Sequence, residues 1–217
     1  MRHFSIVVLL VLLGTCNLAL SQSKDSDKGQ FSGNLLMTYQ KYVRDDSIGA
    51  TTKVYKENTA SADAWLFMQY RIKGYSFILR YDAFNNSPLL DPQDAYTNHG
   101  IGFWQINKSV DKLDITMGSF YDQFGTGILF RAYEQRQIGI DYAIQGMRLK
   151  YNINDKWAVK GFAGNQKGNI KNRFGFANQV ISGLNIEGNI DFVKDSTYGA
   201  LQVTALNTLT LHDAHPI

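Results

Sequence analysis

Few residues in this chain have the type and spacing that a catalytic or metal site requires. The four histidines are His3, His99, His212 and His215, and none pairs with a strand-borne serine as a Ser–His hydrolase would need. The i, i+3 spacing of the last two is a weak metal signal that chance explains better. We therefore predict that the protein is not an enzyme and uses no metal and no cofactor.

Two other motifs are better explained as turns than as sites. Asp45-Asp46 could suggest calcium binding or glycosidase chemistry, but such a pair is more often part of a solvated turn. The sequence Gly125-Thr126-Gly127 lacks the Gly-Lys-Ser/Thr and the following helical pattern of a phosphate-binding loop. Neither motif changes the expectation of a protein without catalytic activity.

The composition is that of a folded chain with little charge. Its 217 residues suggest one domain, or at most two. Aromatic residues make up 13% and charged residues 19%, which argues against intrinsic disorder. One Cys and three Pro exclude a disulfide scaffold and collagen. The formal net charge of 22 − 19 = +3 is too small to indicate a nucleic-acid partner.

The first 21 residues have the features of an export signal. Arg2 and His3 precede an apolar run over 5–13, which is shorter than a membrane-spanning helix needs. Small residues precede a cleavage point after Ser21. An anchoring helix, or lipid attachment at Cys16, is the alternative. The mature chain would begin with a mobile segment over 22–29 and would contain no Cys.

From residue 30 onward, apolar and polar residues alternate with a period of two in several stretches. The clearest of these are 31–43, 62–73, 75–82, 113–117, 147–151, 157–160 and 184–192. Such alternation is typical of strands with one apolar and one polar face. We predict an all-β domain over 30–207 with about eight or nine strands.

The connections fit the same interpretation. Lys73-Gly74 and 152–156 read as short turns, and two prolines mark a longer loop over about 85–99. The last residues, 208–217, show no strand alternation and look like an irregular, non-native tail.

Alternation alone does not distinguish a soluble sandwich from a membrane barrel, in which the apolar face meets lipid. Long charged residues on the polar face, aromatic residues near strand ends and an export signal favour the barrel. We expect an antiparallel up-and-down transmembrane β-barrel, of which this chain supplies an N-terminal portion. The charged side chains expected to face its lumen are Arg71, Arg80, Arg148, Lys150, Lys160 and Glu187. Those expected to face lipid are Leu35, Met37, Leu66, Met68, Phe77 and Leu79.

A central block of sequence carries a family resemblance. Residues 118–136 read GSFYDQFGTGILFRAYEQR, followed by IGID at 138–141 and QGMRLKY at 145–151. This block resembles a Bacteroidetes-type outer-membrane β-barrel family of unknown function, whose pattern is GNFYEQFGxGLxFRxYEER and then LGxDNAxxGxRxKY. The departures are mild and fall at Ser119, Asp122, Gln135 and Tyr142. The resemblance implies a barrel in the outer membrane of a Gram-negative cell and implies no biochemical activity.

The segment 121–142 does not alternate, although the stretches on both sides of it do. Gly125, Gly127 and Gly139 permit sharp bends within it. Its mixture of ions and aromatic residues suits neither lipid nor free solution, so we expect it to fold inward and narrow the lumen. The residues expected at this constriction are Arg131, Tyr133, Glu134, Arg136 and Asp141, with both arginines paired to Glu134, Asp141 or Glu187.

Three functions are compatible with this sequence. The leading one is a porin-like channel for small solutes, in which the inward segment sets ion preference. A non-conducting barrel that serves as a scaffold or accessory of a surface assembly is the second, with the segment acting as a brace. A secreted β-sandwich binding module is the third. The expected partner is the outer-membrane bilayer, and the facing predicts that Leu66→Arg impairs assembly whereas Arg80→Leu is tolerated.

Overall fold

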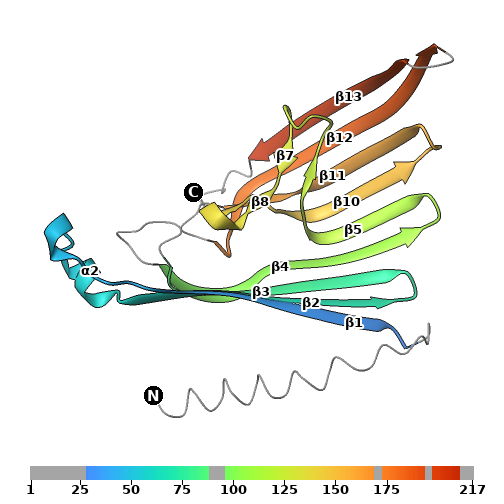
Figure 1. The fold of residues 1–217 in the computed structure, drawn as a ribbon. Helices are drawn as coiled ribbons and strands as arrows, with labels where there is room; N and C mark the ends of the chain where they lie inside the picture. Colours follow the sequence, from blue (N-terminus) through green and yellow to red (C-terminus); the bar gives the residue numbers. More distant parts are fainter. Residues whose placement is uncertain (1–27, 88–95, 169–172, 194–196, 211–217) are drawn as a thin grey trace, which may run out of the picture.

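The computed structural model describes residues 28–87, 96–168, 173–193 and 197–210 of the chain. Most of these residues form one strongly curved antiparallel sheet of nine strands (Figure 1). Each strand pairs with its neighbour along the chain, except that β5 pairs with β10 across an insert. The strands are β1 (Gln30–Lys41), β2 (Ala60–Ile72), β3 (Tyr75–Ser87), β4 (Tyr96–Val110), β5 (Leu113–Phe120), β10 (Ile144–Asn152), β11 (Trp157–Lys167), β12 (Phe176–Val193) and β13 (Thr197–Thr210).

The remaining elements are short. Between β1 and β2 lie a 3-10 turn, η2 (Asp46–Ile48), and a helix, α2 (Lys53–Glu57). The insert between β5 and β10 holds four two-residue strands and a second 3-10 turn. These are β6 (Asp122–Gln123), β7 (Arg131–Ala132), β8 (Glu134–Gln135), η3 (Arg136–Ile138) and β9 (Ile140–Asp141). Within the described ranges, no helix has the length and apolar character needed to cross a membrane.

Tight turns join the strands at one end of the sheet. Lys73 (φ 48°) and Gly74 (φ 76°) form the link between β2 and β3, and Asp111 (φ 52°) lies in the link between β4 and β5. Positive φ at successive turn residues matches the twist of the paired strands, which is why Gly74 suits this place. At the other end the strands are joined by α2, by the insert and by longer connections (Figure 1).

The predicted all-β class and antiparallel neighbour order are confirmed. The nine described strands form an open sheet with β1 and β13 at its edges, so closure into a barrel is not shown. Two strand locations also differ from the prediction. The sequence predicted a loop over 85–99, but β3 continues to Ser87 and β4 begins at Tyr96. No alternation was recognised in 100–110, and these residues form most of β4, whose register with β3 is broken by two irregularities. Only one of these irregularities falls within 100–110, and residues 103–108 pair with β3 without interruption. Phe103 lies on the polar face and Lys108 on the apolar face, and these two exceptions obscure the alternation.

The ends of the chain carry several predictions that the structure leaves open. The signal over 1–21, Cys16 and most of the segment 22–29 lie outside the described residues, as do Pro88 and Pro92. At the other end β13 continues to Thr210, past the predicted boundary at residue 207, and the rest of the tail is outside the described part.

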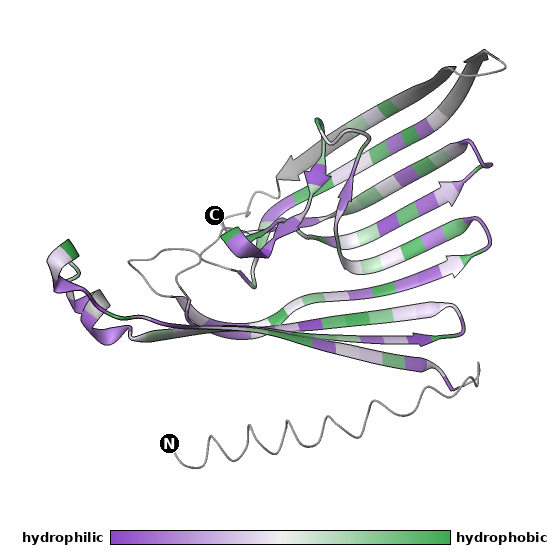
Figure 2. Cartoon of the chain, in the orientation of Figure 1, coloured by the Kyte–Doolittle hydropathy of each residue, from purple (hydrophilic) through white to green (hydrophobic). Residues whose placement is uncertain are grey.

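Hydrophilic and hydrophobic residues alternate along the strands (Figure 2), and the register places the two kinds on opposite faces of the sheet. On one face the registered pairs are apolar, such as Leu35 with Leu66 and Met68 with Leu79, and many of these side chains are exposed. On the opposite face Arg80 and Asp82 are 1% and 0% exposed. The exposed apolar face and the buried charged face reverse the usual order of a soluble antiparallel sheet.

Candidate functional site

The insert folds back over the sheet (Figure 1), and side-chain contacts hold it to the polar face at three places. An ion cluster joins it to β3 and β11, a second ion cluster joins it to β10 and β11, and an aromatic core lies between them. These three contacts define the candidate site.

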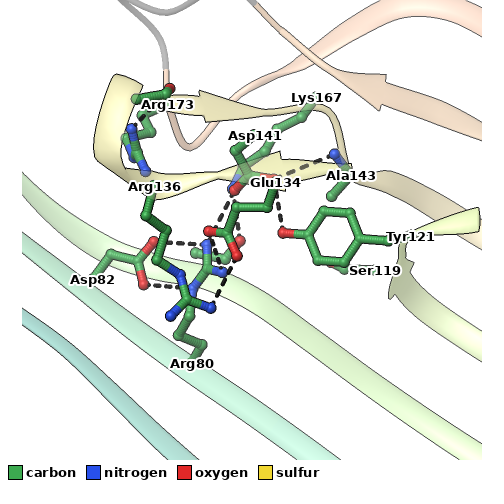
Figure 3. Close-up of polar contacts among 12 residues, drawn as sticks. Arg80, Asp82, Ser119, Tyr121, Glu134, Arg136, Asp141, Ala143, Lys167 and Arg173 are labelled. Carbon is green, nitrogen blue, oxygen red and sulfur yellow. Dashed lines mark hydrogen bonds and ion pairs between the residues drawn. The ribbon is translucent and has the colours of Figure 1, made fainter. Parts of the chain in front are cut away.

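Arg80 of β3 is the centre of the first ion cluster (Figure 3). Its Nε and Nη2 donate to the two carboxylate oxygens of Asp82 at 2.7 and 2.9 Å. Its Nη1 donates to Glu134 Oε1 at 2.7 Å and Nη2 also donates to Asp141 Oδ2 at 3.0 Å. Glu134 accepts a further bond from Arg136 Nη2 at 3.0 Å. One buried guanidinium therefore binds a carboxylate of its own strand and two of the insert.

Asp141 connects the same cluster to β11. Its Oδ2 accepts from Lys167 Nζ at 2.6 Å, and its Oδ1 accepts from the hydroxyl of Tyr121 at 2.9 Å. Lys167 Nζ also donates to Gly102 O at 2.7 Å. Burial raises the pKa of the Asp141 carboxyl, but Lys167, Arg80 and the Tyr121 hydroxyl outweigh it and hold that pKa below its ordinary value. Burial, with Asp141 and Glu134 nearby, raises the pKa of Tyr121.

Asp122 is the centre of the second ion cluster. Its Oδ2 is 3.2 Å from Arg148 Nη1 of β10, and its Oδ1 is 2.9 Å from Lys160 Nζ of β11. Arg148 also donates to Thr116 Oγ1 at 3.1 Å. Both cations occupy registered positions on the polar face, since Arg148 pairs with Thr116 and Lys160 pairs with Lys150. Asp122 thus binds the start of the insert to two neighbouring strands.

An aromatic core seals the insert against the sheet. Phe124 and Phe130 of the insert pack on Phe162 of β11, with ring centroids 5.4 and 4.5 Å from it. All three rings are at most 7% exposed. Gly183 of β12 lies beneath them, and a Cβ at this position would come within 2.7 Å of both Phe124 and Phe162. The absence of a side chain at Gly183 lets the insert approach closely.

The bends of the insert occur at the predicted glycines. Gly125, Gly127 and Gly139 have φ values of 51°, 82° and 71°, in the left-handed region that favours glycine. Gly139 ends η3 and its carbonyl accepts from Arg173 Nη1 at 3.0 Å. The three glycines therefore turn the chain back and forth across the polar face.

The structure brings together only part of the predicted constriction. Glu134, Arg136 and Asp141 lie in the Arg80 cluster, and the predicted pair between Arg136 and Glu134 is present. Arg131 is exposed, makes no ion pair within the described residues, and places its guanidinium 4.7 Å from the centre of the Tyr133 ring. The predicted pairing of Arg131 with a carboxylate is therefore wrong.

The lumen-facing candidates divide in the same way. Arg80, Arg148 and Lys160 bind the insert, as described above. Glu187 Oε1 lies 3.4 Å from Gly125 N and accepts from Asn185 Nδ2, and it forms no pair with either arginine of the insert. Arg71 and Lys150 lie on the polar face but make no ion pair among the described residues. Arg71 is exposed to solvent.

Four residues of the first ion cluster were not singled out from the sequence, and neither were Asp122, Phe162 and Gly183 of the other two contacts. Asp82 was already placed on the polar face by alternation, two residues from Arg80, and that spacing was a usable signal. Lys167, Tyr121 and Arg173 join the cluster from elements distant in sequence. Their contribution depends on how β11 and the insert meet, which no local pattern records.

The chemistry available here is that of a structural clamp. A cavity of about 10 Å³, lined by Gly139, Asp141, Lys167 and Arg173, is large enough for one water molecule. Nε and Nη2 of Arg173 are buried without a hydrogen-bond partner in the described structure, so a water there would satisfy buried donors. The described residues contain no group of three or more side chains with metal-binding chemistry.

Comparison with known proteins gives a family and nothing beyond it. Residues 1–205 match a family model described as a family of unknown function, DUF6029. No curated protein and no solved structure matches the chain. The family description names no fold or cellular location, so the resemblance to outer-membrane barrels stays a prediction.

Proposed function

The chain belongs to the family of unknown function DUF6029, and from its side-chain arrangement we propose an outer-membrane β-barrel that admits small polar solutes. The observation that carries this proposal is the reversed hydropathy of the sheet. Leu66, Met117 and Leu149 are 38%, 50% and 41% exposed on one face, whereas Arg80 and Asp82 on the other face are 1% and 0% exposed. A barrel wall needs this order because apolar side chains meet lipid and polar ones meet the lumen.

The position of the insert supports a constricted lumen. Irregular backbone is tolerated at membrane depth only where protein buries it or water lines it. The insert meets this condition by packing on the polar face, opposite the exposed apolar side chains. Arg131 lies on its exposed side, free of the ion pairs that hold the rest. In a closed barrel this guanidinium would face the water that remains in the lumen, where a charge sets ion preference.

Conductance tests this proposal directly. The full-length protein, refolded into planar bilayers, should give ion currents whose reversal potential shifts in Arg131→Ala. The one Cys, Cys16, lies in the predicted signal, so Arg131→Cys gives a mature chain with a single thiol. A charged thiol reagent should reduce the current through this variant. The control is Asn154→Cys, in the turn before β11, where the same reagent should leave the current unchanged.

A non-conducting scaffold is the second candidate, because most charges of the insert are used to hold it. Arg80, Asp141 and Lys167 have side chains only 1–2% exposed, so they brace the wall and do not contact solvent. Protein that resists carbonate extraction from outer membranes but gives no current would favour this candidate. Protein that remains soluble would contradict both. A sandwich would need a second sheet over the apolar face, and the small sheets of the described part lie on the polar face.

A further inference from the structure

A groove of about 300 Å³ lies on the exposed apolar face, where β1 to β4 meet. This volume is at the lower end of the range for ligand pockets. The side chains that line it are Phe31, Met68, Tyr70, Phe77, Trp104 and Ile106. The register places all of them on the same face as Leu66, since Tyr70 pairs with Phe77 and Phe77 with Ile106.

A lysine lies on the same face, one position beyond the groove toward the turns. Lys108 pairs in register with Tyr75, which is the next position on this face after Phe77 and Ile106. Lys108 Nζ lies 4.0 Å from the centre of the Tyr75 ring and donates to Lys73 O at 2.7 Å. An ammonium has three donors, so two remain for another ligand. Among the described residues no carboxylate forms an ion pair with Lys108, and its positive charge is uncompensated there.

We propose that this groove binds an anionic phospholipid, with one acyl chain along the apolar lining and the phosphate at Lys108. The inference rests on the proposed membrane location. An apolar groove followed along the same face by a lysine matches the order of chemical groups in such a lipid. Tyr75, 43% exposed beside Lys108, is an amphipathic ring suited to the headgroup level.

The end of the sheet at which Lys108 lies assigns the leaflet. Lys108 is beside the two-residue turn Lys73-Gly74, whereas the long connections and the insert lie toward the opposite end (Figure 1). Outer-membrane barrels have short turns on the periplasmic side and longer loops outside. Lys108 therefore lies on the periplasmic side, and the bound phospholipid belongs to the inner leaflet of the outer membrane.

Tryptophan quenching by brominated lipids tests the site, because Trp104 lines the groove and is 36% exposed. The experiment uses the full-length protein with the substitution Trp157→Phe, so that Trp104 and Trp65 are its two tryptophans. Trp65 is only 4% exposed and lies on the polar face, so the lipid quenches Trp104. The protein is reconstituted in phosphatidylcholine containing brominated phosphatidylglycerol or brominated phosphatidylcholine. One lysine near an anionic interface changes lipid affinity about fivefold. We expect phosphatidylglycerol to be preferred at Trp104 by about that factor.

Two variants with the same loss of charge locate the effect. Lys108→Gln should reduce the preference to nearly one, whereas Lys150→Gln, at the same end but on the polar face, should keep it. Equal quenching by the two lipids in the parent, or an unchanged preference in Lys108→Gln, would overturn the lipid site alone. Quenching by neither lipid, in protein that carbonate extracts, would overturn the membrane location and with it this inference.

Discussion

Replacement of Arg80 by leucine should destabilise the protein strongly, although the sequence pattern alone predicts tolerance. The side chain is 1% exposed and its guanidinium contacts three carboxylates within 3.0 Å. Leucine removes the positive charge and leaves the carboxylates in place. The structure therefore reverses the expectation that a lumenal arginine can be exchanged for an apolar residue.

The magnitude follows from the partners that each carboxylate retains. Asp141 keeps Lys167 at 2.6 Å, and Glu134 keeps Arg136 at 3.0 Å. Asp82, 0% exposed, accepts side-chain hydrogen bonds from Arg80 alone in the described structure. Leaving one buried charge uncompensated costs about 3–5 kcal/mol. We expect a loss of this size in Arg80→Leu, most of it caused by Asp82.

Urea unfolding of the refolded protein, followed by tryptophan fluorescence, measures this loss. Arg71→Leu is the matched control, because Arg71 is an exposed arginine of the polar face and its loss should cost about 0.5 kcal/mol or less. The double variant Arg80→Leu/Asp82→Leu should recover at least half of the loss, since an apolar pair can replace a buried ion pair. A loss below about 1 kcal/mol in Arg80→Leu, or no recovery in the double variant, would refute the argument.

Three further changes test other parts of the structure. Leu66→Arg, on the exposed apolar face, should lower assembly into vesicles by about 2–4 kcal/mol, whereas Gln69→Arg on the polar face should not; equal assembly yields would contradict the facing. Gly183→Ala should lower the free energy of unfolding, measured with urea, by about 1–3 kcal/mol and should make the insert sensitive to protease. Gly161→Ala is the control, because its added Cβ meets only ordinary van der Waals contacts, and it should have neither effect. The pKa of Asp141 is lower in the folded than in the unfolded protein, so its contribution to stability is complete above about pH 3.9 and is lost as pH falls through the folded pKa. The free energy of unfolding of the wild type should therefore fall more steeply with acid than that of Asp141→Asn. Parallel curves would contradict the assignment.

The sequence determined those features that repeat locally along the chain. Alternation with a period of two predicted the antiparallel all-β class and the two opposed faces, and glycines predicted the bends of the insert. Side-chain direction in a strand reverses at each residue, so such patterns are visible without knowing which strands meet. In β4 an aromatic residue, Phe103, lies on the polar face and a lysine, Lys108, on the apolar face, and there the prediction failed.

Only the tertiary structure decided which charges meet. Arg80 and Asp141 are separated by 61 positions and Lys160 and Asp122 by 38, so their contacts depend on the register of several strands and on where the insert lands. The sequence placed both arginines of the insert in ion pairs, yet among the described residues only Arg136 reaches a carboxylate, because Arg131 is the exposed residue of β7 and Ala132 the buried one. Periodicity fixes the face on which a side chain lies, and the pairing of distant strands fixes its partner.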